Sequence, residues 1–452
     1  MNELLTRQNR KTRVTELLPA MNVLALLMIW RSNYCTSSLV IALFPPIIFI
    51  VMFAVWFIFA MITDATFLRK LVDKAGALML FIIINMCLDL FFSMTIKVEM
   101  INCLIALVMF AMMIFYSGRK DCEKFKRLVL VIIIIDLLIK ILYSINEILI
   151  NPAIVKQMST AGANENREVS ILVADYSTVY TCVVIAIFMF GLWKRVPGKG
   201  LRRLTFICAL ILTYFIFVCS FFFALILFVY GIAVLFFIKR KVHYITFPIV
   251  VLLLILIFKQ PIASFCWQMS QQPYWNDIMQ GKWNDMYMLL TYGSDAAYMS
   301  DMRLDLMQKS LETFIKYPLL GVYSFNISAS VGRHSAWLDG LASYGIVRYA
   351  LFLAFLISLF KELLKDRKSG KRKVVKKRRL ETTGISKKRK RPLYAAISIY
   401  ILLSVVNPNV FPQIWVTFCV LIPFYNDIVI RKTRKRRRRK HGQYGRHNNP
   451  LL

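Results

Sequence analysis

Long apolar runs dominate this chain, and short polar or basic stretches separate them. A run of about 20 apolar residues is long enough for a helix to cross the hydrocarbon core of a bilayer. The pattern therefore predicts an all-α, polytopic integral membrane protein with about twelve transmembrane helices. The expected spans lie near residues 17–30, 38–62, 75–94, 100–116, 128–149, 171–192, 204–218, 221–238, 244–258, 341–360, 393–406 and 411–430.

One large polar segment interrupts these spans between the ninth and the tenth. Its residues, 259–340, carry six Lys or Arg against seven Asp or Glu, whereas the loops at 117–127, 193–203, 239–241 and 361–391 are basic. Basic loops stay on the cytoplasmic side, so we expect both termini in the cytoplasm and this segment outside it. The predicted parts are a basic N-terminus (1–16), nine spans (17–258), the extracytoplasmic segment (259–340), the tenth span (341–360), a basic loop (361–391), two spans (392–430) and a basic tail (431–452).

The net charge of +34 comes mostly from two blocks. Residues 361–391 hold 16 Lys or Arg against three acids, and residues 431–452 hold ten against none. Both blocks follow apolar runs, which favours contact with anionic membrane lipids over binding of nucleic acid. The nine cysteines are scattered without a C-x-x-C pair, so no disulfide framework or metal set is expected.

Within the external segment, residues 301–317 have the periodicity of an amphipathic helix. Ser300 is the expected N-cap, and Pro318 is expected to end the helix. Arg303 would lie neither on the apolar face of this helix nor on its solvated stripe, where oppositely charged residues stand four positions apart. In the first turn it would lie beside unpaired backbone N–H groups, which together make a good site for an anion.

Three features follow one another here: Arg303 near a helix start, the turn Pro318-Leu319-Leu320-Gly321, and the pair His334-Ser335. In their order, and in their place between the ninth and tenth spans, they resemble the O-antigen ligase and O-antigen polymerase superfamily of bacterial cell-envelope glycan assembly. The likeness in span number covers most of the chain, but the motifs are confined to about 45 residues.

The resemblance implies transfer of glycan from an undecaprenyl-diphosphate carrier to a sugar hydroxyl, outside the bacterial cytoplasmic membrane and without a metal or other cofactor. It implies that Arg303 binds the diphosphate and that His334 is the base, roles that suit a permanent cation and an imidazole. The family often has a Ser-Arg pair where this chain has Ser220-Phe221. Arg333 or Arg167 is the candidate to replace the missing cation.

A polymerase of capsule, exopolysaccharide or O-antigen repeat units is the leading hypothesis, with a flippase and a chain-length regulator of the same pathway as implied partners. Transfer to a different acceptor, as in a ligase, is the first alternative. A transporter or flippase of lipid-linked glycans is the second, because intramembrane charges are functional candidates. It would depend on Asp89, Asp136, Lys140 and Asp175. A docking platform for other envelope proteins is the third.

Aromatic residues of the external segment could stack on sugar rings. The candidates are Trp275, Trp283 and Trp337. An aromatic belt at the membrane interface is the alternative explanation for such residues.

Overall fold

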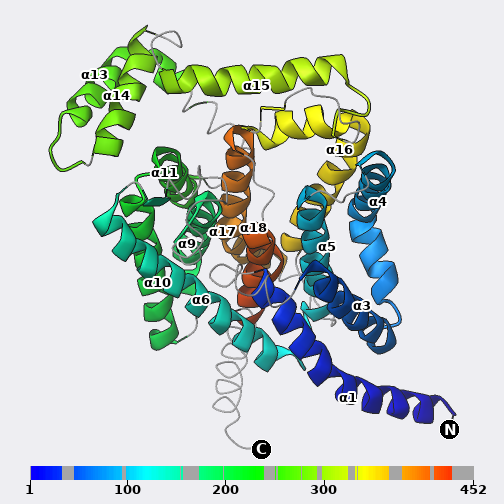
Figure 1. Ribbon diagram of the computed structural model, residues 1–452. Helices are drawn as coiled ribbons and strands as arrows, with labels where there is room; N and C mark the ends of the chain where they lie inside the picture. The colour runs from blue at the N-terminus through cyan, green and yellow to red at the C-terminus, as the bar shows by residue number, and fades with distance from the viewer. Residues whose placement is uncertain are drawn as a thin grey trace, which may run out of the picture.

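The computed structural model describes residues 2–32, 45–93, 98–152, 154–155, 173–196, 198–238, 250, 253–275, 277–292, 298–323, 331–332, 334–365, 379–407 and 412–429 (Figure 1). All regular elements within these ranges are helices. They are α1 (Asn2–Arg31), α3 (Pro46–Thr63), α4 (Phe67–Ser93), α5 (Val98–Tyr116), α6 (Glu123–Ile150), α9 (Tyr176–Leu192), η1 (Trp193–Arg195), α10 (Lys199–Val218), α11 (Phe222–Phe237), α13 (Lys259–Ser270), α14 (Asp277–Tyr292), α15 (Tyr298–Lys316), α16 (Ala336–Leu363), α17 (Arg379–Val406), α18 (Pro412–Val416) and the π-helix η4 (Thr417–Leu421).

The described helices include five that are long and apolar enough to cross a membrane, namely α4, α5, α6, α10 and α16. Three shorter apolar helices, α3, α9 and α11, accompany them. Large apolar side chains such as Phe91 and Phe237 are more than 70% exposed, at 78% and 76%, which suits lipid as the surrounding solvent. The predicted all-helical fold is confirmed, and the helices indicate a membrane-embedded protein. The predicted ninth span, 244–258, lies largely outside the described residues.

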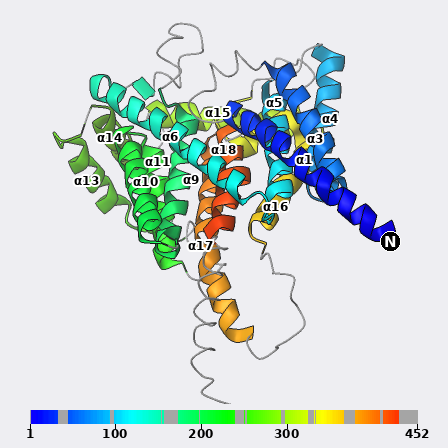
Figure 2. The same ribbon diagram turned by 90° about the horizontal axis from the view of Figure 1, so that it is seen from below.

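The centre of the bundle is formed by α9 and α5, whose residues are mostly buried. α9 packs against α10, α11 and α17, while α5 packs against α4, α18 and η4. Figure 2 shows α1 reaching out of the bundle at its N-terminal end, whereas its C-terminal half packs on α3. α17 begins at Arg379, so the second part of the predicted basic loop 361–391 is helical.

Ion pairs join the helices at one end of the bundle. The Lys126 ammonium is 2.8 Å from the Asp427 carboxylate, which also accepts a 2.8 Å hydrogen bond from the Gly118 amide. Lys74, near the start of α4, pairs with Glu362, near the end of α16, at 2.9 Å. The loop after α5 belongs to this end, where the sequence predicts the cytoplasmic side.

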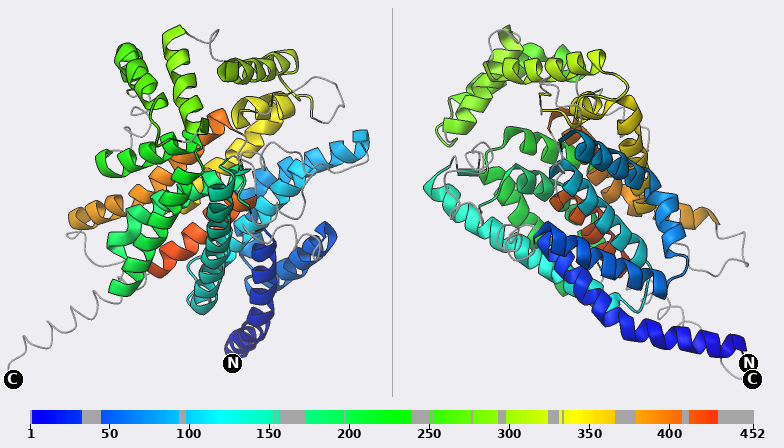
Figure 3. Two further views of the ribbon diagram at one scale, coloured as in Figure 1. Left: turned by 60° about the vertical axis from the view of Figure 1, so that its left-hand side comes forward. Right: turned by 45° about the vertical axis from the view of Figure 1, so that its right-hand side comes forward.

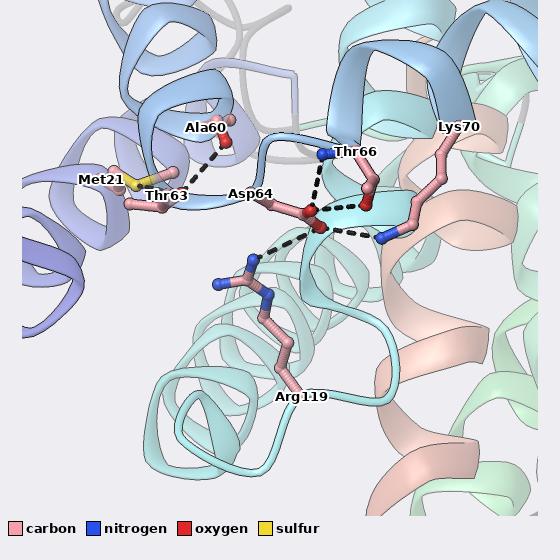
Figure 4. A network of polar contacts seen from close by, with 7 residues as sticks. All are labelled: Met21, Ala60, Thr63, Asp64, Thr66, Lys70 and Arg119. Atoms are coloured by element: carbon pink, nitrogen blue, oxygen red, sulfur yellow. Dashed lines mark hydrogen bonds and ion pairs between the residues drawn. The ribbon is translucent and has the colours of Figure 1, made fainter. Parts of the chain in front are cut away.

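Asp64, between α3 and α4, lies at the same end (Figure 4). Its carboxylate accepts hydrogen bonds from the Thr66 amide at 3.0 Å, the Thr66 hydroxyl at 2.6 Å and the Lys70 ammonium at 2.9 Å. The Arg119 guanidinium approaches to 3.8 Å. Burial acts to raise the pKa of this carboxyl, but the hydrogen bonds from Lys70 and Thr66 outweigh it and lower the pKa to about 2.

The contribution of Asp64 to stability should therefore depend on pH. The ordinary pKa of 3.8 applies in the unfolded chain and about 2 in the folded one, so the unfolded chain takes up the proton first as the pH falls. The stabilisation is present above about pH 5 and is lost progressively as the pH falls through the folded-state pKa, between about pH 5 and pH 1. In thermal unfolding, Asp64→Asn should melt below the wild type at pH 7, and the gap should close on acidification. Asp121→Asn, at an exposed site in the loop after α5, is the control. A difference in melting temperature between Asp64→Asn and the wild type that stays constant down to pH 2 would contradict the lowered pKa of Asp64.

Three helices of the predicted external segment form a layer at the opposite end of the bundle. Figure 1 shows α13, α14 and α15 above the other helices, and both views of Figure 3 keep this layer at one end. α13 and α14 pack on each other as a hairpin, and α15 packs on the first part of α16. This layer carries the residues singled out by the sequence.

Candidate functional site

The helix that carries Arg303 begins earlier than the sequence pattern indicated. α15 runs over Tyr298–Lys316, so Ser300 is its third residue and the expected N-cap there is wrong. Nothing in Tyr298–Ser300 breaks a helix, and the pattern continues through these residues. Arg303 is consequently the sixth residue and lies in the second turn. The unpaired N–H groups of the helix start belong to the residues before it.

Position 303 lies on the side of α15 that faces the rest of the protein. Ser310 is fully buried on this helix, and residue 303 precedes it by seven positions, which is nearly two turns. Leu306 lies between them on the same face. A Cβ atom at Gly332 would be only 1.9 Å from the Leu306 carbonyl oxygen, so the two backbones are in direct contact. The segment that leads to His334 thus crosses α15 about one turn from Arg303.

Hydrogen bonds hold this segment on α15 and on α16. The Gly332 amide donates to the Ser310 hydroxyl at 2.9 Å, and that hydroxyl donates to Asp339 Oδ1 at 2.6 Å. Asp339 Oδ2 accepts from the Ser335 amide at 2.9 Å. Ser335 also caps α16, because its hydroxyl accepts from the Leu338 amide at 3.3 Å. His334, half-buried, is therefore held between two anchored neighbours.

Ser310 and Asp339 were missed by the sequence reasoning as members of the site. Asp339 follows Ser335 by four residues, and a carboxylate at that distance from a capping serine can reach back to the helix start. The four-residue spacing from Ser335 is the sequence feature that could have identified Asp339 as a member of the site. Ser310 offered none, because a serine inside an amphipathic helix usually lies on its solvated side.

The predicted turn after α15 packs into a break in α16. Gly321 and Gly345 both have positive φ, 62° and 66°, and the chain bends sharply at Gly345 within α16. A Cβ on Gly345 would lie 2.3 Å from the Leu319 carbonyl oxygen. We call residues 318–323 together with 342–347 the turn–kink contact. Its backbone hydrogen bonds run from Val322 to Ala342 (3.1 Å), Tyr323 to Ser343 (2.9 Å), Ile346 to Pro318 (2.8 Å) and Val347 to Leu319 (3.4 Å).

Tyr323 extends the turn–kink contact to α5. Its hydroxyl donates to the Glu99 carboxylate at 3.3 Å. Burial raises the pKa of the Tyr323 phenol, and the neighbouring Tyr344 and Glu99 raise it further. The phenol is therefore protonated at neutral pH and remains a hydrogen-bond donor.

Two of the three aromatic candidates are packed among other aromatic rings. The Trp275 ring centroid is 5.6 Å from that of Phe217, and the Trp283 centroid is 5.0 Å from that of Phe222. These rings attach the α13–α14 hairpin to the turn between α10 and α11. Trp337, in the first turn of α16, has a buried indole N–H that finds no hydrogen-bond partner among the described residues. Stacking of any of the three on a sugar stays a prediction.

The other arginine candidates, Arg333 and Arg167, lie outside the described residues. Phe221 stands at the position where an arginine was expected from the resemblance stated above. It precedes α11 and packs on Tyr176 with ring centroids 4.6 Å apart. The residue before it, Ser220, has φ of 55°, which is an uncommon conformation for a residue other than glycine. This turn is tight and aromatic.

Three of the four charges considered for the transport alternative, Asp89, Asp136 and Lys140, are buried within the bundle, and Asp175 is half-buried. Asp175 is the N-cap of α9, where its carboxylate accepts from the Thr178 amide at 2.9 Å and from the Ser177 hydroxyl at 2.8 Å. Lys140 interacts with it electrostatically. Asp89 is fully buried in α4. Asp175 thus has a structural role that explains its presence.

Among the described residues, no group of three or more His, Cys, Asp or Glu side chains could hold a metal ion. A scan against models of protein families finds no match for this chain, and a comparison with curated proteins finds none either. The candidate site is therefore defined by its own residues and by the contacts between them.

Proposed function

We propose that this protein polymerises lipid-linked oligosaccharide repeat units, and that Arg303 and His334 act together in the reaction. One observation carries the proposal: the segment with His334 crosses α15 at Leu306, about one turn from Arg303, and is fastened to α15 through Gly332, Ser310 and Asp339. The two residues are 31 positions apart in the sequence. A cation and a base held on facing backbones are what glycan transfer from a diphosphate carrier requires.

In the proposed reaction, an acceptor sugar hydroxyl attacks the anomeric carbon of the donor glycan. The bond from that carbon to the diphosphate oxygen breaks, and the diphosphate leaves on its polyprenyl carrier. His334 takes the proton of the attacking hydroxyl. Arg303 stabilises the negative charge that develops on the departing diphosphate, which is a large term in reactions of this kind.

We infer a twelve-span topology in the bacterial cytoplasmic membrane with both termini in the cytoplasm. The positive blocks at 361–391 and 431–452 support this orientation. The layer of α13, α14 and α15 would then lie on the outer side, where carrier-linked repeat units are joined. α5 and α16 both begin beside this layer and end at the opposite end of the bundle, in agreement with this orientation.

The test is reconstitution of the purified protein in liposomes with a lipid-diphosphate-linked oligosaccharide, followed by analysis of product length. A ladder of longer carrier-linked chains is the expected result. Transfer only to an added second acceptor would identify a ligase instead. Movement of a fluorescent lipid-linked oligosaccharide across the membrane, without any transfer, would identify a transporter and overturn the proposal.

A further inference from the structure

Arg348, just over three turns into α16, is a buried arginine that the sequence analysis did not single out. Its side chain is only 2% exposed. The Nε atom donates to the Tyr344 carbonyl at 3.1 Å, and Nη1 donates to Asn85 Oδ1 at 2.7 Å. The Nη2 atom donates to the Leu320 carbonyl and, at 3.4 Å, to the Ser343 carbonyl. The planar guanidinium thus uses all three of its nitrogens.

These acceptors belong to three different parts of the structure. Leu320 lies in the turn that ends α15, Ser343 and Tyr344 lie in α16 just before its break at Gly345, and Asn85 lies in α4. Asp89, one turn further along α4, is fully buried and interacts electrostatically with Arg348. Arg348 therefore joins the turn–kink contact to α4 of the membrane-embedded bundle, as Tyr323 joins it to α5.

The burial of Arg348 argues against a direct role in binding substrate. An enclosed guanidinium whose three nitrogens all donate to carbonyl and amide oxygens is shielded from a phosphate. Carbonyl acceptors in the turn–kink contact would in turn lose a buried partner if the guanidinium were removed. Its effect on any reaction must pass through the position of α15 and of the first part of α16.

We propose that Arg348 is a positioning residue that fixes the layer carrying Arg303 and His334 on the bundle. The expected effect of Arg348 on catalysis rests on the proposed function. Its role in fixing the layer on the bundle does not depend on that function. The planar shape of the side chain matters as well as its charge, because a lysine cannot reach acceptors in three directions from one plane.

The activity test compares Arg348→Lys, Arg348→Gln and Asn85→Ala in the reconstituted protein. Arg348→Lys should lower kcat about 100-fold, since a displacement of about 1 Å has an effect of that order. Asn85→Ala removes one acceptor only and should lower kcat by a smaller factor, which keeps the test usable if an Arg348 variant fails to fold. Wild-type kcat in Arg348→Lys would overturn the proposal.

Lys126→Met is the matched control. Lys126 is a second buried cation, 1% exposed, which binds the Arg119 carbonyl at 3.2 Å and Asp427 at the opposite end of the bundle. Its loss should destabilise the protein but leave the kcat of the folded fraction unchanged. An equal fall in kcat for Lys126→Met and Arg348→Lys would show that general destabilisation is responsible, and would also overturn the proposal.

A distance measurement tests the positioning role without reference to activity. Spin labels can be attached through genetically encoded keto amino acids at Gln308 on α15 and Leu80 on α4, because the exposed Cys87 would react with thiol reagents. The distribution of the distance between the labels should be at least twofold broader in Arg348→Lys than in the wild type. An unchanged width would overturn the proposal. If the wild type transfers no glycan, the proposed function fails while this measurement still decides the role of Arg348.

Discussion

Reconstituted protein with His334→Ala should transfer glycan at least about 100-fold more slowly than the wild type. A positioned general base contributes roughly this factor or more. The backbone around His334 is held at Gly332 and Ser335, whose amides bind Ser310 and Asp339 at 2.9 Å each, so the substitution should remove the base without moving this segment. The measurement is the initial rate of chain elongation at saturating lipid-linked substrate.

Arg303→Ala should produce a fall of similar size, because the departing diphosphate would lose its cation. Arg303→Lys should recover only part of the rate, since an ammonium cannot bind two phosphate oxygens in the bidentate geometry of a guanidinium. Lys309→Ala is the matched control within α15, at an exposed position. His447→Ala, in the basic tail, is the control for the histidine.

The pattern across these variants separates the hypotheses. A loss of elongation in both site variants with intact controls supports one shared site. If both variants elongate chains at the wild-type rate, the assigned site is wrong. If elongation depends on Asp89 or Asp175 and not on the site pair, the transport alternative gains support.

Gly345→Ala should have the largest effect on the structure itself. The glycine has φ of 66° and ψ of 173°, a region that other residues enter only at high cost. Its added Cβ would also lie 2.3 Å from the Leu319 carbonyl oxygen and 2.6 Å from the Leu320 amide nitrogen. Since both neighbours are backbone atoms, the turn would have to move away. Strain and overpacking together should cost about 3 kcal/mol of stability.

The measurement is thermal unfolding in detergent, combined with the rate of glycan transfer by the folded fraction. Gly281→Ala in α14 is the matched control, because a Cβ there meets no atom of the described part of the chain within 4 Å. This control should be neutral or slightly stabilising, as expected for alanine in place of glycine inside a helix. A Gly345→Ala protein as stable as the control would contradict the described turn–kink contact.

The sequence by itself determined that this protein is helical and that its helices are suited to a membrane. Those properties follow from local composition: an apolar run such as 128–149 becomes α6 in any fold that satisfies its backbone hydrogen bonds. Pro318 ended α15 close to the predicted place for an equally local reason. The helix start was misplaced because nothing in Tyr298–Ser300 marks a boundary, and boundaries without a breaker are weakly encoded.

Only the tertiary structure decided which residues meet. Ser310 and Asp339 are 29 positions apart and unremarkable as sequence, yet a 2.6 Å hydrogen bond joins them and holds the segment with His334. Arg348 and Asn85 are 263 positions apart, and Leu320 offers Arg348 a backbone carbonyl, a group that every residue possesses. A local pattern cannot encode such partners, because their proximity depends on how α4, α15 and α16 pack. Helices are specified by neighbours in the chain, whereas this site is specified by the contacts between helices.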